Sequence, residues 1–153
     1  MSDKIIKLSD VSNGALLITM PSGNQALIIG GPYYNKPDSN FVGVKMAVEV
    51  DMPCDINVPT EDFSVPDVQV LRRALIKAVV AMSKGKTLYI GCMGGIGRTG
   101  LFIAALIRIF EPYENPVLLT RQAYLLSAVE TIEQQDFIHS LPLGDIIELA
   151  QLA

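Results

Sequence analysis

The sequence predicts a single α/β domain, built on a central mixed, partly parallel sheet flanked by helices. Two observations lead to this fold class. Short apolar runs alternate with longer segments of helical periodicity, in the order strand, helix, buried strand, helix. The chain has 153 residues, of which 50% are hydrophobic, and this is enough to bury the core of one domain. No repeat, low-complexity tract or linker divides residues 1–153, so we expect one domain throughout.

The predicted strands begin with a hairpin, because two apolar runs flank the turn signal Pro21-Ser22-Gly23-Asn24. In chain order, the predicted strands are 16–20, 25–29, 44–50, 56–58 and 87–90. The fourth is a short strand inside 52–65, whose prolines and acidic residues otherwise predict a loop. The last is a continuous apolar run, which is typical of a strand buried on both faces.

Each predicted helix has a start signal or an apolar face. The predicted helices are 66–84, 99–110, 115–127, a segment that begins at 131, and 144–152. Ser64 and Asp67 resemble a capping box before the first helix, and Thr131 and Gln134 resemble another. The apolar face of the first helix consists of Val68, Leu71, Leu75, Val79 and Met82. Residues 99–110 are apolar on nearly all sides, so we expect a buried helix there.

Charge and cysteine content exclude several classes of function. With 12 basic and 16 acidic residues and a net charge of −4, the chain lacks the basic field needed to bind nucleic acid or an anionic membrane. Its longest apolar run, Leu101–Ile107, is too short for a membrane helix, and the first residues do not resemble a signal peptide. Cys54 and Cys92 are too few for a disulfide scaffold and lack metal-ligand spacing. We expect a cytoplasmic protein with reduced thiols.

The segment that carries chemistry lies between the predicted buried strand and the predicted buried helix. It reads Cys92-Met93-Gly94-Gly95-Ile96-Gly97-Arg98-Thr99. The glycines let consecutive backbone N–H groups turn inward as an anion nest, and the following helix adds its positive N-terminus. Such surroundings favour a thiolate on Cys92, and the planar fork of Arg98 can hold two phosphate oxygens. Thr99 can donate a hydrogen bond to the thiolate. A glycine-rich turn with an inert buried cysteine is the alternative explanation.

The pattern C-x-x-G-x-x-R-T after an apolar strand resembles the signature loop of the protein tyrosine phosphatase superfamily, in its small dual-specificity-like branch. Members carry a mobile loop upstream of the cysteine, and an aspartate of this loop is the general acid. Asp62 lies thirty residues before Cys92 and is followed four residues later by Pro66, as in that loop. Residues 128–134 resemble a segment of the branch whose glutamine lies near the site. The resemblance covers about residues 44–140.

This resemblance implies a cysteine-phosphatase fold and a phosphate monoester hydrolase that forms a phosphocysteine. Cys92 would be the nucleophile, and Arg98 would bind phosphate. Asp62 would protonate the leaving oxygen and then activate water, and Thr99 would help the thiolate to leave. The residues implied to contact substrate are Met93, Gly94, Gly95, Ile96, Gly97, Arg98 and Gln134. No metal or other cofactor is implied, and the expected substrate is phosphotyrosine, another phosphorylated protein or a small phosphate monoester.

One departure from the family pattern keeps other hypotheses open. Gly91 stands where the family usually has a histidine before the cysteine, so we expect a looser loop. A phosphate-binding module with weak or no turnover is therefore a second hypothesis, and a redox or sulfur-transfer thiol enzyme is a third. Gln134 has two interpretations, a helix cap or a residue that positions the hydrolytic water. Cys54 is interpreted either as a structural cysteine or as a disulfide partner of Cys92.

Overall fold

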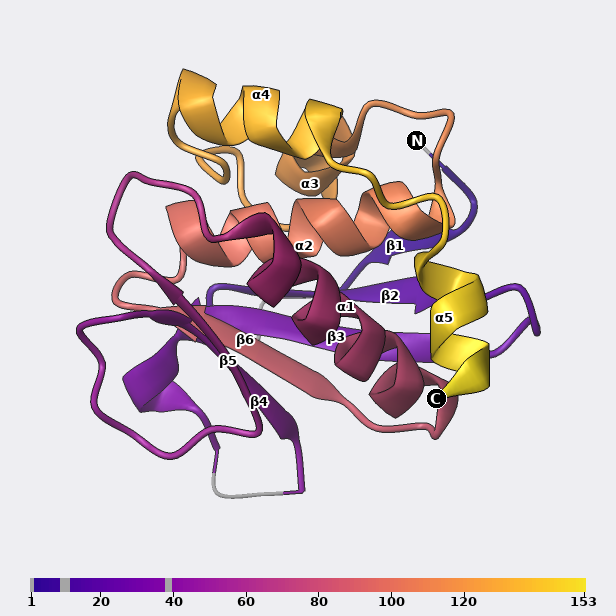
Figure 1. Cartoon of the computed structure of the whole chain (residues 1–153), viewed down its shortest axis with the longest axis horizontal. Helices are drawn as coiled ribbons and strands as arrows, with labels where there is room; N and C mark the ends of the chain where they lie inside the picture. Colours follow the sequence, from indigo (N-terminus) through magenta and orange to yellow (C-terminus); the bar gives the residue numbers. More distant parts are fainter. Residues whose placement is uncertain (1, 9–11, 38–39) are drawn as a thin grey trace.

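The computed structural model describes residues 2–8, 12–37 and 40–153. Within these ranges six strands form one sheet in the order β1-β2-β3-β6-β4-β5 (Figure 1). The strands are β1 (Ile5–Lys7), β2 (Gly14–Thr19), β3 (Gln25–Pro32), β4 (Val42–Ala47), β5 (Ile56–Thr60) and β6 (Leu88–Cys92). The predicted hairpin is confirmed as β2 and β3, and the predicted class, an α/β fold with a mixed sheet, is also confirmed.

Strand β6 lies in the middle of the sheet and runs parallel to both of its neighbours, β3 and β4. β4 is also parallel to β5, whereas β2 is antiparallel to both β1 and β3. As a result, β3, β4, β5 and β6 all end at the same edge of the sheet. The segments that follow these strands meet there, and this carboxyl edge is where α/β sheets place their ligands.

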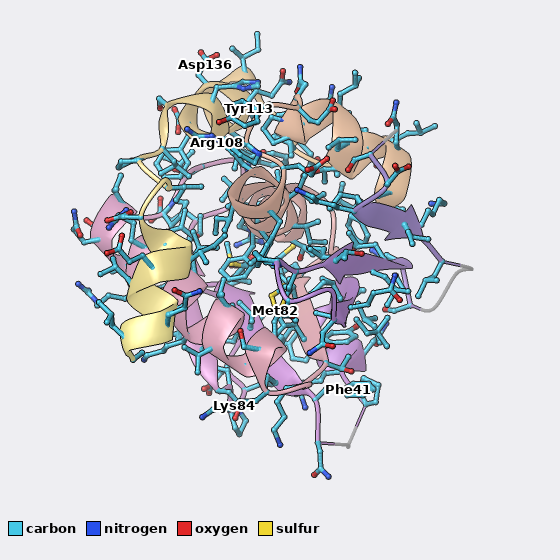
Figure 2. The ribbon with its side chains drawn as sticks, turned by 90° about the vertical axis from the view of Figure 1, so that its right-hand side faces the viewer. Phe41, Met82, Lys84, Arg108, Tyr113 and Asp136 are labelled. Carbon is cyan, nitrogen blue, oxygen red and sulfur yellow. The ribbon has the colours of Figure 1, made fainter. Side chains whose placement is uncertain are left out.

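The helices of the described ranges are α1 (Val68–Ser83), α2 (Gly97–Phe110), α3 (Pro116–Ala123), α4 (Ile132–Ser140) and α5 (Ile146–Leu152), with a short 3-10 helix, η1 (Tyr33–Asn35). α1 and α2 pack on the sheet, α3 and α4 pack against α2, and α5 packs against α1 (Figures 1 and 2). Every α2 residue except Arg108 is buried, which confirms the predicted buried helix. Across the described residues, no helix combines the length and the apolar character needed to span a bilayer.

Alternate strand residues point to opposite sides of the sheet. Buried residues lie on both of its faces. The main core lies on the helix side and includes Leu16, Ile28, Leu88 and Ile90. The other face carries a smaller cluster of Ala15, Ile29 and Tyr89. All of β6 is buried, as predicted for the run 87–90. The strand that ends in Cys92 is therefore held from both sides.

Helix α1 begins later than predicted because a different residue caps it. The carboxylate of Asp67 accepts hydrogen bonds from the backbone N–H groups of Gln69 and Val70, so Asp67 itself is the N-cap. The proposed capping box of Ser64 with Asp67 is therefore wrong, and the helix starts at Val68. An aspartate placed in this way satisfies two backbone donors that the first turn leaves free.

The later helices follow their start signals more closely. Thr131 and Gln134 form the predicted capping box at the start of α4, with both reciprocal hydrogen bonds present. Asn115 caps α3, but α3 ends at Ala123, earlier than the predicted 127. Residues 124–131 instead form irregular turns, in which Val129 has a positive φ of 59°. Local periodicity could not reveal this turn, because side-chain hydrogen bonds from Arg121 and Gln134 to its backbone hold it.

The two edge strands, β1 and β5, also differ from the sequence prediction. β1 was not expected, since it has three residues of which only Ile5 is buried. β5 extends to Thr60, beyond the predicted 56–58, and includes Pro59. Proline cannot donate a hydrogen bond to a neighbouring strand, and β5 tolerates it because β5 is an edge strand. The longer β5 carries the chain directly to the segment that contains Asp62.

Candidate active site

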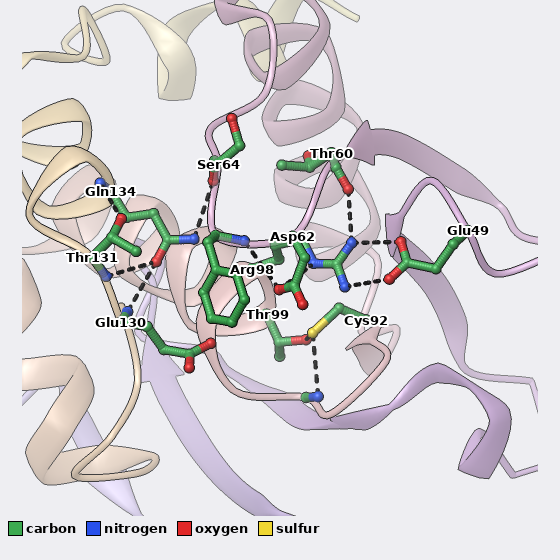
Figure 3. Close-up of polar contacts among 12 residues, drawn as sticks. Glu49, Thr60, Asp62, Ser64, Cys92, Arg98, Thr99, Glu130, Thr131 and Gln134 are labelled. Atoms are coloured by element: carbon green, nitrogen blue, oxygen red, sulfur yellow. Dashed lines mark hydrogen bonds and ion pairs between the residues drawn. The ribbon is translucent and has the colours of Figure 1, made fainter.

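Cys92 is the last residue of β6, and its side chain is 3% exposed. The backbone N–H of Gly95 and the hydroxyl of Thr99 each donate a hydrogen bond of 3.2 Å to its Sγ atom (Figure 3). Helix α2 begins five residues after Cys92, and the N–H groups of its first turn have no partner within the helix. Donors that converge in this way favour negative charge on the sulfur and on any group bound beside it.

Two side chains hold the loop after Cys92 from outside. Asn13 Nδ2 donates to the carbonyl of Gly94 at 2.7 Å and to that of Gly95 at 3.3 Å. The hydroxyl of Tyr124 also donates to the Gly95 carbonyl, and burial, followed by the proximity of Cys92, raises the pKa of Tyr124 and keeps it a neutral donor. Since the C=O and N–H of one trans peptide point in opposite directions, these contacts turn the N–H groups of Gly95 and Ile96 inward.

Arg98 is 1% exposed and reaches from α2 to the segment that follows β4. Its Nη1 and Nη2 atoms donate to the two carboxylate oxygens of Glu49, each at 2.7 Å, and Nη1 also donates to the carbonyl of Thr60 at 2.8 Å (Figure 3). Nε is buried and has no hydrogen-bond partner among the described residues. Glu49 therefore occupies one edge of the guanidinium and leaves the edge that contains Nε for a ligand.

The pairing with Glu49 also determines the charge of both groups. Hydrogen bonding to Arg98 lowers the pKa of Glu49 to about 2, so Glu49 is ionised at neutral pH. Burial, the largest single influence, acts to lower the pKa of Arg98, but the hydrogen bonds to Glu49 and the nearby charges of Cys92, Glu49 and Asp62 together outweigh it and leave that pKa above its usual value. At neutral pH, Arg98 is thus a cation, and the ionised Glu49 fixes its orientation.

Asp62 lies two residues after the end of β5, at the open edge of Arg98. Its Oδ1 atom is 3.7 Å from Arg98 Nε, and its side chain is 54% exposed. Oδ1 also accepts a hydrogen bond of 3.0 Å from the backbone N–H of Phe63, a residue with a positive φ of 60°. The Asp62 carboxylate is therefore both close to the Arg98 guanidinium and open to solvent.

The other acidic residues of this region have different environments. Asp55 Oδ2 accepts a hydrogen bond of 2.7 Å from the backbone N–H of Gly43, and Asp67 caps α1. Glu61 is exposed, and no ion pair to it occurs within the described residues. Of these four carboxylates, only Asp62 forms an ion pair with Arg98.

Gln134 joins the Asp62 segment to the start of α4. Its side chain is fully buried, and its Oε1 atom accepts from the N–H groups of Glu130 at 2.9 Å and Thr131 at 3.2 Å. Its Nε2 atom donates to the carbonyl of Ser64 at 3.1 Å (Figure 3). The helix-cap interpretation of Gln134 is confirmed, whereas a contact with substrate or water stays a prediction.

Packing, and not catalysis, explains why position 91 is a glycine. A Cβ atom at this position would lie 2.6 Å from the Cα and 2.8 Å from the backbone N of Tyr33. These are backbone atoms of η1, which cannot move aside as a flexible side chain could. The close approach of η1 to β6 therefore leaves no room for a histidine, or any side chain, just before Cys92 in this chain.

Other candidates from the sequence lie away from this cluster or are already paired. Cys54 is half-buried, and neither it nor Cys92 forms a disulfide. Arg72 of α1 pairs with Asp145 at 2.7 Å. In the part of the chain that the structure describes, no three His, Cys, Asp or Glu side chains are grouped as a metal site.

Sequence reasoning missed Glu49, Asn13, Tyr124 and Glu130. Glu49 was placed inside a predicted strand, 44–50, but β4 ends at Ala47. A shorter strand would have put Glu49 on the carboxyl edge, and this is the one signal that could have identified it. Asn13 and Tyr124 act on backbone carbonyls of the loop, a role without a sequence signature.

Several solved structures have a fold similar to that of this chain. Tk-PTP in its active form matches with a TM-score of 0.64 at 23% identity, over 92% of this chain and 97% of that one. PTPMT1 matches with a TM-score of 0.61 at 17% identity, over 84% and 95% of the two chains. The chain has the protein tyrosine phosphatase fold. Kinase associated phosphatase, with serine in place of its catalytic-site cysteine, matches with a TM-score of 0.58 at 13% identity, over 86% and 94%.

Sequence comparison finds two relatives, both uncharacterized. Two uncharacterized proteins of Methanocaldococcus jannaschii are each 35% identical over 81 residues, which is 53% of this chain. The match spans about half of each relative, 54% of one and 50% of the other. No family model matches the sequence.

Proposed function

We propose that this chain is a phosphate monoester hydrolase that works through a phosphocysteine on Cys92. One observation carries the proposal: the buried sulfur receives two hydrogen bonds, and the free Nε of Arg98 lies buried in the same site. Three inward-facing kinds of donor, namely loop amides, the start of α2 and a guanidinium edge, suit an anion with several oxygens. The phosphatase fold supports the same reaction class.

In the first step, the Cys92 thiolate attacks phosphorus, so that an S–P bond forms while the P–O ester bond breaks. Asp62 gives its proton to the departing oxygen, and the alcohol or phenol leaves. Arg98 and the backbone N–H groups of residues 93–98 bind the three other phosphoryl oxygens. Because Glu49 holds the guanidinium in place beforehand, little reorganisation is needed as charge develops.

In the second step, water attacks phosphorus and the S–P bond breaks. Asp62, now ionised, takes the proton from water, and inorganic phosphate is released. The sulfur leaves as a thiolate, which the Thr99 hydroxyl stabilises through its hydrogen bond. No residue is consumed, because Cys92 and Asp62 return to their starting states.

Phosphotyrosine in a protein, or another aryl phosphate, is the proposed substrate. Two apolar side chains of the site segments, Phe63 and Met93, are 59% and 46% exposed and can contact an aromatic ring. PTPMT1 has been solved in complex with PI(5)P, but loop positions 93–97 of this chain carry no lysine or arginine for extra phosphates. We also keep the cytoplasm as the proposed compartment, on the ground of the two unpaired cysteines.

The rival function is a phosphate-binding module with weak or no turnover. It is favoured by Gly91, which stands where the family has histidine, and by nothing else in the site. A sulfur-transfer or redox enzyme would not need the fixed guanidinium of Arg98. Of the three functions, only the hydrolase releases phosphate from a phosphate ester.

Release of phosphate from p-nitrophenyl phosphate in the presence of a chelator tests the proposal. We expect turnover by the parent chain and none by Cys92→Ser, because a hydroxyl is far less ionised than a thiol. Cys54→Ser is the matched control and should stay active in reducing buffer. Binding of phosphate esters without turnover would favour the rival module, and substantial activity in Cys92→Ser would refute the covalent route.

A further inference from the structure

The turn that precedes α4 is held rigidly above the phosphate loop. Arg121 donates from Nε to the carbonyl of Ala128 at 3.0 Å and from Nη2 to that of Val129 at 2.9 Å. Gln134 accepts from the backbone N–H of Glu130 at 2.9 Å. Val129 has a φ of 59°, a left-handed conformation that β-branched residues rarely adopt. The backbone of Glu130 is thus fixed from both sides in a conformation that the chain would not choose locally.

This turn directs the Glu130 side chain at the loop. A Cβ atom at Gly97 would overlap Oε1 of Glu130 and come within 3.0 Å of its Cδ, so the carboxylate lies in space that any other residue at 97 would fill. Gly97 is the first residue of α2 and directly precedes Arg98. Figure 3 shows Glu130 and Glu49 on opposite sides of Cys92.

Glu130 differs from the two other carboxylates at the site because it has no cation of its own. Glu49 is paired with Arg98, and Asp62 lies 3.7 Å from the same guanidinium. No hydrogen bond or ion pair to the Glu130 carboxylate occurs among the described residues. The guanidinium of Arg121 is near in the chain, but it is committed to two backbone carbonyls.

The buried, unpartnered Nε of Arg98 marks where an anion would bind, and the exposed Glu130 lies beside Gly97, at the rim of the loop that leads to Arg98. A phosphate ester with two negative charges would be repelled by this uncompensated carboxylate. A positive group on the substrate would remove the repulsion and replace it by attraction. The rim therefore discriminates between substrates by the charge next to the phosphate.

We propose that Glu130 is a specificity-determining residue that binds an ammonium or guanidinium group beside the phosphorylated side chain of the substrate. The substrate class is then a phosphorylated protein segment with a lysine or arginine near the phosphate. Esters that carry further anionic groups are disfavoured. This inference rests on the proposed function for its biological meaning, but the recognition of charge can be measured without turnover.

The test uses phosphotyrosine peptides that carry one arginine, scanned over the two positions on each side, and the same peptides with neutral citrulline instead. We expect kcat/KM at one or more positions to be roughly three- to tenfold higher for arginine, the usual effect of a charge pair at a rim. Glu130→Gln should bring that ratio close to one. Glu133→Gln removes the same charge from an exposed site in the first turn of α4 and should leave the ratio unchanged.

Dissociation constants of the same peptides for Cys92→Ser, with and without Glu130→Gln, separate recognition from catalysis. A ratio that persists in Glu130→Gln, or a parent that favours citrulline or binds no peptide, would overturn the inference even if p-nitrophenyl phosphate is hydrolysed. An arginine preference in binding that depends on Glu130 supports the inference even if no ester is hydrolysed. In that last case it is the proposed function that fails.

Discussion

The guanidinium of Arg98 and the carboxylate of Glu49 form two parallel hydrogen bonds of 2.7 Å each. Glu49 lies in the segment after β4, and Arg98 lies in the first turn of α2, the helix that follows β6. Arg98 is almost completely buried, whereas the Glu49 side chain is 41% exposed. Glu49 therefore acts from the surface to fix a buried cation, and it decides which edge of that cation remains open for phosphate.

The first prediction concerns pH and stability. Hydrogen bonding to Arg98 lowers the pKa of Glu49 to about 2, from a usual value of about 4.3 in an unfolded chain. The pair therefore stabilises the fold fully above the unfolded value and loses this contribution as pH falls toward 2. We expect thermal unfolding to show parent and Glu49→Gln converging between pH 5 and pH 2. A difference that stays constant over this range would mean that Glu49 is not the titrating partner.

The second prediction concerns the geometry of Arg98. Arg98→Lys keeps the positive charge but cannot contact Glu49 and phosphate through separate edges of one planar group. We expect kcat/KM on p-nitrophenyl phosphate to fall, and the fall should correspond to a loss of about 2–4 kcal/mol of transition-state stabilisation. Arg108→Lys is the control, since Arg108 lies near the far end of the same helix. An Arg98→Lys protein within a few-fold of the parent would place phosphate elsewhere.

The third prediction identifies the general acid. Asp62→Asn should slow hydrolysis of esters with poor leaving groups by about 10²–10⁴-fold, the usual contribution of general acid catalysis. The loss should shrink as the leaving phenol becomes more acidic, because a stable anion needs no proton. A series of aryl phosphates with graded leaving groups measures this dependence.

Two neighbouring variants are the controls for that series. Asp55→Asn removes a carboxylate that bonds to the backbone of Gly43, and Glu61→Gln removes the exposed residue next to Asp62. Both should show the leaving-group dependence of the parent. If either becomes more sensitive to the leaving group while Asp62→Asn does not, the acid is misassigned although Cys92 remains the nucleophile.

The fourth prediction concerns Gly91. An added Cβ would lie 2.6 Å from a backbone atom of Tyr33, so Gly91→Ala should lower the free energy of unfolding by about 1–3 kcal/mol through overpacking. Gly91→His should fare worse and should not raise activity. Gly144→Ala, where a Cβ meets nothing within 4 Å, is the control. Denaturant unfolding of the parent and the three variants measures these differences in stability. A Gly91→Ala protein as stable as the parent would contradict the crowding at Tyr33.

Several elements were predictable because their causes are local. The hairpin of β2 and β3 follows from a turn signal between two apolar runs, and α4 begins at its predicted capping box. The start of α1 was wrong because Asp67 and Ser64 both suit a cap, and only the packed chain shows which one accepts the N–H groups. Periodicity also could not show that β4 stops at Ala47 and releases Glu49 to the site.

The sequence by itself determined the loop that contains Cys92, Arg98 and Thr99, because these residues lie within eight positions and their spacing already implies an anion nest between strand and helix. Tertiary structure alone decided what surrounds the loop. Glu49 lies 49 residues from Arg98, and Ser64 lies 70 residues from Gln134. Glu49 and Arg98 meet because parallel strands end at a common edge, whereas Gln134 reaches Ser64 from the start of α4. No local pattern records which distant side chains arrive there.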